Sequence, residues 1–218
     1  MRKNLSPRSL GFSGTVQSEL IELALTYGFV SIDLDIVDFS EQVEDFGMEH
    51  ARRLLDSAKL KIGNFNLPVN VAGTDEAFAA DLARLPGLAR VAADLGCARA
   101  LCSLESANDA MEFKDNFEQH RLRLTQVAET LASFSVSVAL DFDGAKASRE
   151  GKQFEFIHDL DGAVTLANTI GAANVGVLID FWQIHACGAT LEDIRKVPVE
   201  KIVSVNVADV KADLERED

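Results

Sequence analysis

Three strand-like segments of this sequence end in a side chain that carries an oxygen donor. Asp141 ends the apolar run 136–141, Asp180 ends the run 174–180, and Asn206 ends the run 202–206. A buried parallel strand reads as a near-continuous apolar run. In barrels of such strands, polar residues at the carboxyl-terminal tips face the place where chemistry occurs. Hard divalent cations prefer carboxylate and carbonyl oxygens, so the pattern predicts a site for a hard metal ion or for sugar hydroxyls.

Such a site could support proton transfer next to a carbonyl group. A divalent cation held there would polarise a sugar carbonyl and its neighbouring hydroxyl, so that a carboxylate could move a proton at the carbon between them. The same residue types have a second interpretation, because aspartate after a strand is also a frequent helix N-cap and turn former. The residues alone leave both interpretations open for Asp141 and Asp180.

Side chains that follow the strand tips are candidates for substrate contact. Trp182 could form an apolar wall for a sugar ring, or it could plug the top of a barrel. Gln183 and His185 follow at once as potential ligands. Arg149, in the long segment after 136–141, could meet a phosphate or carboxylate of a substrate, or it could be solvated at the surface.

The composition is that of an ordinary globular protein with one large core. The chain has 218 residues, of which 47% are hydrophobic and 26% are charged. Its formal net charge is −14 and its basic residues are scattered. Such a field repels polyanions, so nucleic acid is not expected as a partner, whereas a divalent cation is favoured.

Features that would direct the chain to a membrane or an oxidising compartment are not found in the sequence. No apolar stretch approaches the roughly 20 residues that cross a bilayer, and the basic start at Met1 is not followed by the apolar segment of a signal peptide. The three cysteines, Cys97, Cys102 and Cys187, lack metal-type spacing. We therefore expect a cytoplasmic protein with reduced thiols and no membrane contact.

Strand-like and helix-like segments alternate along the chain. Strands are expected at 8–12, 31–36, 61–67, 99–104, 136–141, 175–180 and 202–207, and helices at 15–27, 48–58, 75–95, 116–133, 160–170 and 191–197. The helix at 75–95 contains Pro86 and Gly87, where a break is possible. This alternation predicts an α/β fold with a parallel sheet and right-handed crossovers.

Two closures of such a sheet are possible, an open doubly wound sheet or a (β/α)8 barrel. The open sheet usually carries a glycine-rich phosphate loop after its first strand, and the segment 11–15 has neither that pattern nor a Walker motif. We therefore expect a single domain over 1–218, a (β/α)8 TIM-type barrel truncated after the seventh strand, because 208–218 is too short and too charged for an eighth unit. The two open edges would favour a homo-oligomer in which a partner closes the barrel.

Several segments together resemble a known family. They are Asp141-Phe142-Asp143-Gly144, Phe154-Glu155-Phe156-Ile157, the run 174–185, Val205-Asn206-Val207-Ala208-Asp209, and the pattern from Gly28-Phe29 to Asp33. In order and spacing they are similar to the xylose-isomerase-like TIM barrels, the sugar phosphate isomerase/epimerase group. That group also includes inosose dehydratase, hydroxypyruvate isomerase and endonuclease IV.

The resemblance implies a ligand set that this chain keeps only in part. Asp141 stands where the family has a glutamate, Asp180 matches its counterpart, and Asn206 replaces a histidine. The aspartate of the family's H-x-x-D pattern is retained as Asp209. The family's substrate histidine is Gln183 here, with His185 two positions on, and Arg149 resembles positions that cover the site. These correspondences imply a divalent metal (Mn, Mg, Co or Zn) and substrate contacts from Asp209, Gln183, His185, Trp182 and Arg149.

The implied activity is metal-assisted isomerisation or epimerisation of a small sugar, sugar phosphate or polyol, with Asp141 as the catalytic base. Two alternatives stay open, because the ligand set departs from the family pattern. One is a non-catalytic barrel that serves as a binding or assembly subunit, and the other is a lyase similar to inosose dehydratase. An endonuclease is not expected, because it would need a histidine-rich multi-zinc site and a basic DNA-binding face.

Overall fold

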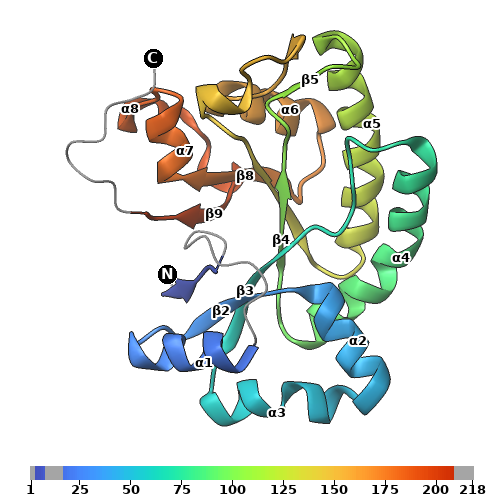
Figure 1. Cartoon of the computed structure of the whole chain (residues 1–218), viewed down its shortest axis with the longest axis vertical. Coiled ribbons are helices and arrows are strands. Elements are labelled where there is room, and N and C mark those ends of the chain that lie inside the picture. The colour runs from blue at the N-terminus through green and yellow to red at the C-terminus, as the bar shows by residue number, and fades with distance from the viewer. Residues whose placement is uncertain (1–2, 8–16, 209–218) are drawn as a thin grey trace.

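A computed structural model describes residues 3–7 and 17–208 of the chain. Within these ranges, seven parallel strands form one sheet in the order β1-β2-β3-β4-β6-β8-β9 (Figure 1). The strands are β1 (Asn4–Leu5), β2 (Ser31–Leu34), β3 (Lys61–Asn66), β4 (Arg99–Ser103), β6 (Ser137–Asp141), β8 (Val175–Asp180) and β9 (Ile202–Asn206). The spatial order follows the chain without the reversal that defines a doubly wound sheet. The prediction of a TIM-type barrel is confirmed: the described residues form seven parallel strands of a barrel of the (β/α)8 type.

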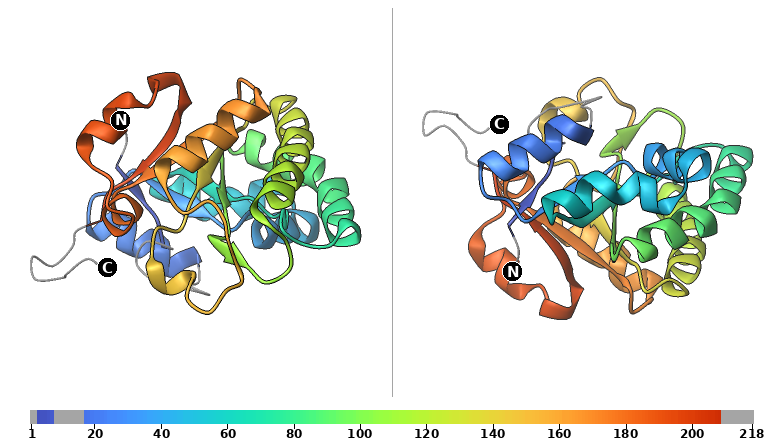
Figure 2. Two further views of the ribbon diagram at one scale, coloured as in Figure 1. Left: turned by 90° about the horizontal axis from the view of Figure 1, so that it is seen from above. Right: turned by 90° about the horizontal axis from the view of Figure 1, so that it is seen from below.

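Helices follow the strands and cover the outer face of the sheet (Figure 2). They are α1 (Gln17–Thr26), α2 (Ile36–Phe46), α3 (Met48–Ala58), α4 (Asp75–Asp94), α5 (Phe113–Ala132), α6 (Leu160–Ile170), α7 (Phe181–Ala186) and α8 (Leu191–Lys196). α5 packs on β6 and α6 packs on β8, while α4 and α5 contact each other on one flank. None of the helices described is both long and apolar enough to span a bilayer.

The centre of the sheet is buried on both faces. Val138, Leu140 and Val177 are inaccessible to solvent and face the helix layer or the neighbouring strands. On the inner face, Leu101, Ala139 and Leu178 form a separate small cluster against which Val203 packs. Since these three residues come from β4, β6 and β8, they mark the face of each strand that points into the barrel.

Two short strands outside the main sheet connect the loops above it. β5 (Ala107–Asn108) pairs antiparallel with β7 (Phe154–Glu155). The Asp109 carboxylate holds this arrangement by accepting hydrogen bonds from the Lys152 ammonium at 2.8 Å and the Gln153 amide at 3.1 Å. The loops after β4 and β6 are therefore fixed to each other.

The structure differs from the sequence expectations at particular elements. α2, α7 and the β5–β7 pair were not predicted, and the expected strand at 8–12 lies outside the described residues. The break considered near Pro86 does not occur, because α4 continues through it with Pro86 on the solvent side. Leu85, Leu88 and Ala89 are buried around it, so packing against the core holds the helix together despite the lost backbone hydrogen bond.

Candidate functional site

The predicted ligands lie on the inner face of neighbouring strands. Side chains alternate along a strand, so Asp141 lies on the same face as Ala139, and Asp180 lies on the same face as Leu178. Asp180 is the register partner of Asn206 in β9. The three predicted residues therefore stand at the carboxyl ends of β6, β8 and β9. Continued by one residue, the β6–β8 register puts Asp141 beside Leu178, two residues before Asp180. We call this set the strand-end group.

Asp180 has both of the roles that the sequence left open. Its Oδ1 atom caps α7 by accepting hydrogen bonds from the backbone N–H groups of Trp182 at 2.8 Å and Gln183 at 3.4 Å. Its Oδ2 atom accepts a hydrogen bond from Nδ2 of Asn206 at 3.1 Å. One carboxylate thus starts a helix and joins two strand ends.

Asp141 is a buried carboxylate, 5% exposed, beside the loop that follows β4. Its backbone carbonyl accepts a hydrogen bond from Leu104 N–H at 2.8 Å, and its register partner is Ser103. Burial raises the pKa of the neighbouring Cys102 thiol to about 12, and the negative charge of Asp141 adds to that rise. Cys102 is therefore protonated at neutral pH, and it is not a thiolate ligand.

Gln183 and Arg149 both hold the loop that follows β6. Oε1 of Gln183 accepts a hydrogen bond from Gly144 N–H at 2.7 Å. Nη1 of Arg149 donates to the carbonyls of Gly144 at 3.3 Å and Ala145 at 3.1 Å. A Cβ atom on Gly144 would lie 2.6 Å from the Gln183 carbonyl oxygen, so only glycine allows this close approach. In this structure the two side chains shape the rim of the candidate site.

Trp182 and His185 lie together on α7. The Trp182 side chain is 39% exposed, and its ring centroid lies 6.5 Å from that of His185. Nε2 of His185 is buried and has no hydrogen-bond partner within the described residues. An unsatisfied imidazole nitrogen beside an exposed aromatic ring could receive a substrate hydroxyl. The fifth predicted substrate contact, Asp209, lies outside the described residues.

A second polar network inside the barrel was not predicted. Oδ1 of Asp33 in β2 accepts hydrogen bonds from Nδ2 of Asn4 at 2.7 Å, and from the backbone N–H and Nδ2 of Asn64 at 2.9 Å and 2.8 Å. Burial raises the pKa of the Asp33 carboxyl, and these hydrogen bonds partly oppose the rise. The signal in the sequence was a charged residue inside the apolar strand 31–36.

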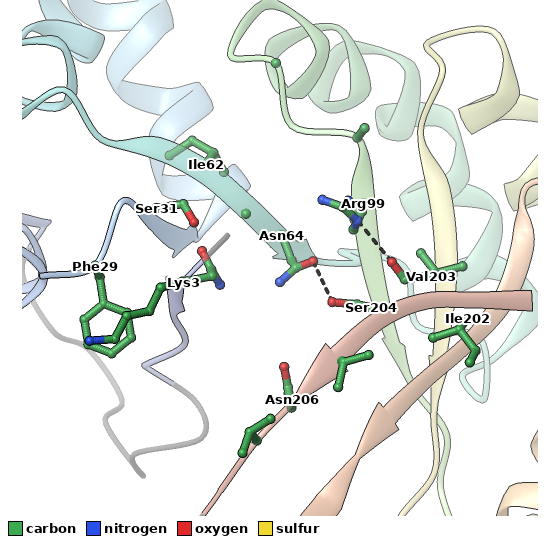
Figure 3. A pocket seen from close by; sticks show the side chains of 16 residues that line it. Lys3, Phe29, Ser31, Ile62, Asn64, Arg99, Ile202, Val203, Ser204 and Asn206 are labelled. Carbon is green, nitrogen blue, oxygen red and sulfur yellow. Dashed lines mark hydrogen bonds between the residues drawn. The ribbon is translucent and has the colours of Figure 1, made fainter. Parts of the chain in front are cut away.

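A cavity of about 860 Å³ opens between β1 and β9 (Figure 3). It runs along all five residues of β9 and past the amino-terminal ends of β2, β3 and β4. Two contacts cross it: the Ser204 hydroxyl donates to Oδ1 of Asn64 at 3.3 Å, and Nε of Arg99 donates to the Val203 carbonyl at 3.1 Å. The cavity shares only Asn206 with the strand-end group, so we assign it to the open seam of the barrel.

The strand-end group offers a divalent cation two carboxylates and one amide. No three His, Cys, Asp or Glu side chains gather into a metal-binding set in residues 3–7 and 17–208. A cation here would therefore depend on two carboxylates and the amide oxygen of Asn206, which is not used in the contact with Asp180. All-oxygen donor sets of this kind are the ones that hard ions such as Mg²⁺ or Mn²⁺ prefer.

Comparison with known proteins agrees with this geometry. The family model described as "Xylose isomerase-like TIM barrel" matches residues 21–217. The chain therefore belongs to the xylose isomerase-like TIM barrel family.

Solved structures share the fold over most of this chain. A xylose isomerase domain protein from Alicyclobacillus acidocaldarius superposes with a TM-score of 0.84 at 27% identity, covering 94% of this chain and 72% of that protein. The IOLI protein with a binding zinc atom gives a TM-score of 0.74 at 18% identity, over 93% and 70% of the two chains. D-psicose 3-epimerase in the presence of D-fructose gives 0.75 at 13% identity, over 94% and 72%.

Curated relatives match a shorter part of the chain. An inosose isomerase from Halalkalibacterium halodurans is 25% identical over 88 residues, and one from Bacillus subtilis is 24% identical over the same length. Each match covers 40% of this chain and 29% of the relative. The matched segment therefore spans less than a third of the length of these relatives.

Proposed function

We propose that this protein is an isomerase or epimerase of a small sugar, sugar phosphate or polyol. The observation that carries the proposal is the strand-end group, in which Asp180 and Asn206 are hydrogen-bonded across two strands and Asp141 ends the next strand on the same face. Oxygen donors at the carboxyl end of a parallel barrel are where such enzymes place their chemistry. The isomerases and epimerases with similar sequences or folds support the same class.

Each residue of the site has a proposed role. Asp141 is the base that removes a proton from the carbon next to a carbonyl, and its position at the end of β6 puts it on the inner face of the barrel. Nε2 of His185 and the amide nitrogen of Gln183 bind substrate hydroxyls, while Trp182 provides an apolar wall for the ring. Arg149 and Asp209 complete the proposed substrate contacts.

Asp141, Asp180 and Asn206 would hold a divalent cation, with Mn²⁺ and Mg²⁺ favoured over Co²⁺ and Zn²⁺ by the all-oxygen donor set. When bound, the cation would supply Lewis-acid polarisation of the substrate carbonyl. The proposed compartment is the cytoplasm, which the free thiols of Cys97, Cys102 and Cys187 support.

Deuterium incorporation measures the proposed proton transfer directly. The protein is incubated in D₂O with a panel of small ketoses, aldoses, their phosphates and inososes, with each of the four cations, and exchange at the carbon next to the carbonyl is followed by NMR. We expect exchange with at least one substrate, and a loss of about 10²–10⁴-fold in Asp141→Asn, the usual contribution of a positioned base.

The control is Asp161→Asn, which makes the same change at an exposed position on α6. It is expected to keep the wild-type rate. Exchange that is equally fast in Asp141→Asn would contradict the assigned base.

The alternative is a binding barrel without turnover. The observation that favours it is the use of Asp180 as a helix cap and as the partner of Asn206. Calorimetry with the same panel separates the two functions. Binding of a sugar that shows no exchange with any cation would support the binding protein and overturn the proposed enzyme.

A further inference from the structure

The register between β8 and β9 shifts by one residue before the two strands reach the candidate site. Val177 pairs with Ile202, but the next residue of β8, Leu178, pairs with Ser204. Val203 is therefore an extra residue in β9, as in a β-bulge. Bulges are frequent next to active sites, where they change the direction of a side chain.

The side chains at this point show the same irregularity. They alternate between the two faces along a regular strand, yet Val203 and Ser204 both point into the barrel. Val203 packs against the inner apolar cluster, and the Ser204 hydroxyl donates to Oδ1 of Asn64 in β3 at 3.3 Å (Figure 3). The extra residue therefore reverses the alternation of the side chains along β9.

The extra residue decides which side chain of β9 faces Asp180. In the observed register Asp180 pairs with Asn206, and their side chains are hydrogen-bonded at 3.1 Å. An uninterrupted ladder would instead place Val205 beside Asp180 and turn Asn206 to the other face. That register would also turn Val205, which is 43% exposed, toward the apolar interior. The apolar pattern of β9 therefore does not select the observed register, and other contacts must do so.

Contacts from β4 and β8 hold the extra residue in place. Nε of Arg99 in β4 donates to the Val203 carbonyl at 3.1 Å (Figure 3). Because a bulge disrupts the ladder, this side chain supplies a donor where regular pairing is lost. Gly176 of β8 allows the close approach, since a Cβ atom there would collide with the Lys201 carbonyl oxygen and lie 2.9 Å from Cγ2 of Val203. Arg99 is itself fixed by its pairing with Ser137 of β6.

We propose that Arg99 is a positioning residue of the strand-end group. Its guanidinium holds Val203 as the extra residue of β9, and the resulting register turns Asn206 toward Asp180. The inference rests on the proposed function, which gives the strand-end group its role. Arg99 begins β4, whereas Asp180 and Asn206 end β8 and β9, so Arg99 acts through the strand register and not by contact with the substrate.

NMR spectroscopy reads the register directly, from contacts between backbone protons of β8 and β9. The wild type should place Asp180 beside Asn206. Arg99→Met keeps the apolar stem but removes the donor, so contacts between Asp180 and Val205 should appear in a second set of signals. Arg99→Lys still donates hydrogen bonds and should restore most of the wild-type set.

Arg84→Met supplies the matched control, because it makes the same change at an exposed position of α4. It should keep the wild-type register, and circular dichroism establishes that each variant is folded. Deletion of Val203 is a second test, since it leaves an uninterrupted ladder that still pairs Asp180 with Asn206. In that background Arg99→Met should not change the register, because no extra residue remains to be held.

The register and the proposed activity are measured separately. Deuterium exchange at the substrate carbon should fall by about tenfold or more in Arg99→Met and recover in Arg99→Lys, since small displacements within a site cost this much. An unshifted register in folded Arg99→Met, a shift that Arg99→Lys does not reverse, or a shift without loss of exchange would overturn the role of Arg99. A wild type without any exchange would contradict the proposed enzyme instead, and the register alone would then decide the role of Arg99.

Discussion

The closed centre of the barrel and its open seam are built from similar strands. β8 reads Val-Gly-Val-Leu-Ile-Asp and has five of its six residues buried, whereas β9 reads Ile-Val-Ser-Val-Asn and has none buried. The strands differ in their neighbours: β8 lies between β6 and β9, whereas among the described residues β9 pairs with β8 alone. An apolar strand sequence therefore does not by itself make a strand buried. The strand is buried only where neighbouring strands cover it on both sides.

The largest expected effect compares truncations in the two regions. Leu140 in β6 is inaccessible to solvent, and Leu140→Ala should lower the free energy of unfolding by about 2–5 kcal/mol through lost burial and a cavity. Val205→Ala in β9 should cost less than about 1 kcal/mol, because the side chain is already 43% exposed. Urea unfolding measures both. Equal losses would show that the seam is packed as tightly as the centre.

A smaller loss of stability is expected at Asp180, which ends β8 and is hydrogen-bonded to Asn206 of β9. Asp180→Ala removes the cap of α7 and the partner of Asn206, and should cost about 0.5–2 kcal/mol of unfolding free energy. Asp180→Asn keeps a capping side chain and should cost less. If thermal unfolding ranks the two variants in the opposite order, capping is not what Asp180 contributes to stability.

Arg99 offers a finer test of the seam itself. Arg99→Met removes the donor to the Val203 carbonyl but keeps the apolar stem, so stability should fall by less than about 1 kcal/mol. Hydrogen exchange should nevertheless quicken in β9 and stay unchanged in β8. Faster exchange spread evenly over both strands would mean that Arg99 supports the whole sheet.

The last effect appears only as a dependence on pH. Burial raises the folded-state pKa of Asp33 above its usual 3.8, so the folded protein holds this proton more tightly than the unfolded chain. The stability that results is complete below pH 3.8 and is lost as pH rises through the raised pKa. Asp33→Asn cannot titrate, so its stability relative to the wild type should rise across that window. A constant difference, from urea unfolding at each pH, would show that Asp33 ionises normally.

Much of the centre of the fold could be predicted from the sequence. The expected segments 48–58, 160–170 and 175–180 coincide with α3, α6 and β8, because continuous apolar runs and capping residues are local signals. α7 was not predicted, since it has only six residues and its helix depends on the cap that the Asp180 side chain provides. α2 likewise begins at a carboxylate cap, that of Asp35, directly after a strand.

The candidate site, like the fold, could be predicted from the sequence only in part. The hydrogen bond between Asp180 and Asn206 joins two strand ends that the sequence placed at one end of a barrel. The Asp33 network could not be predicted, because its donors, Asn4 and Asn64, lie 29 and 31 residues away along the chain. Contacts of that range depend on strand register, which one sequence does not determine.

Titration with Mn²⁺, followed by electron paramagnetic resonance, tests the central claim that Asp141, Asp180 and Asn206 form one cation site at the strand ends. The wild type should bind Mn²⁺, Asp141→Asn and Asp180→Asn should each weaken binding by about tenfold or more, and Asp161→Asn should bind as the wild type does. Equal Mn²⁺ binding by all four proteins, or none by the wild type, would contradict the account.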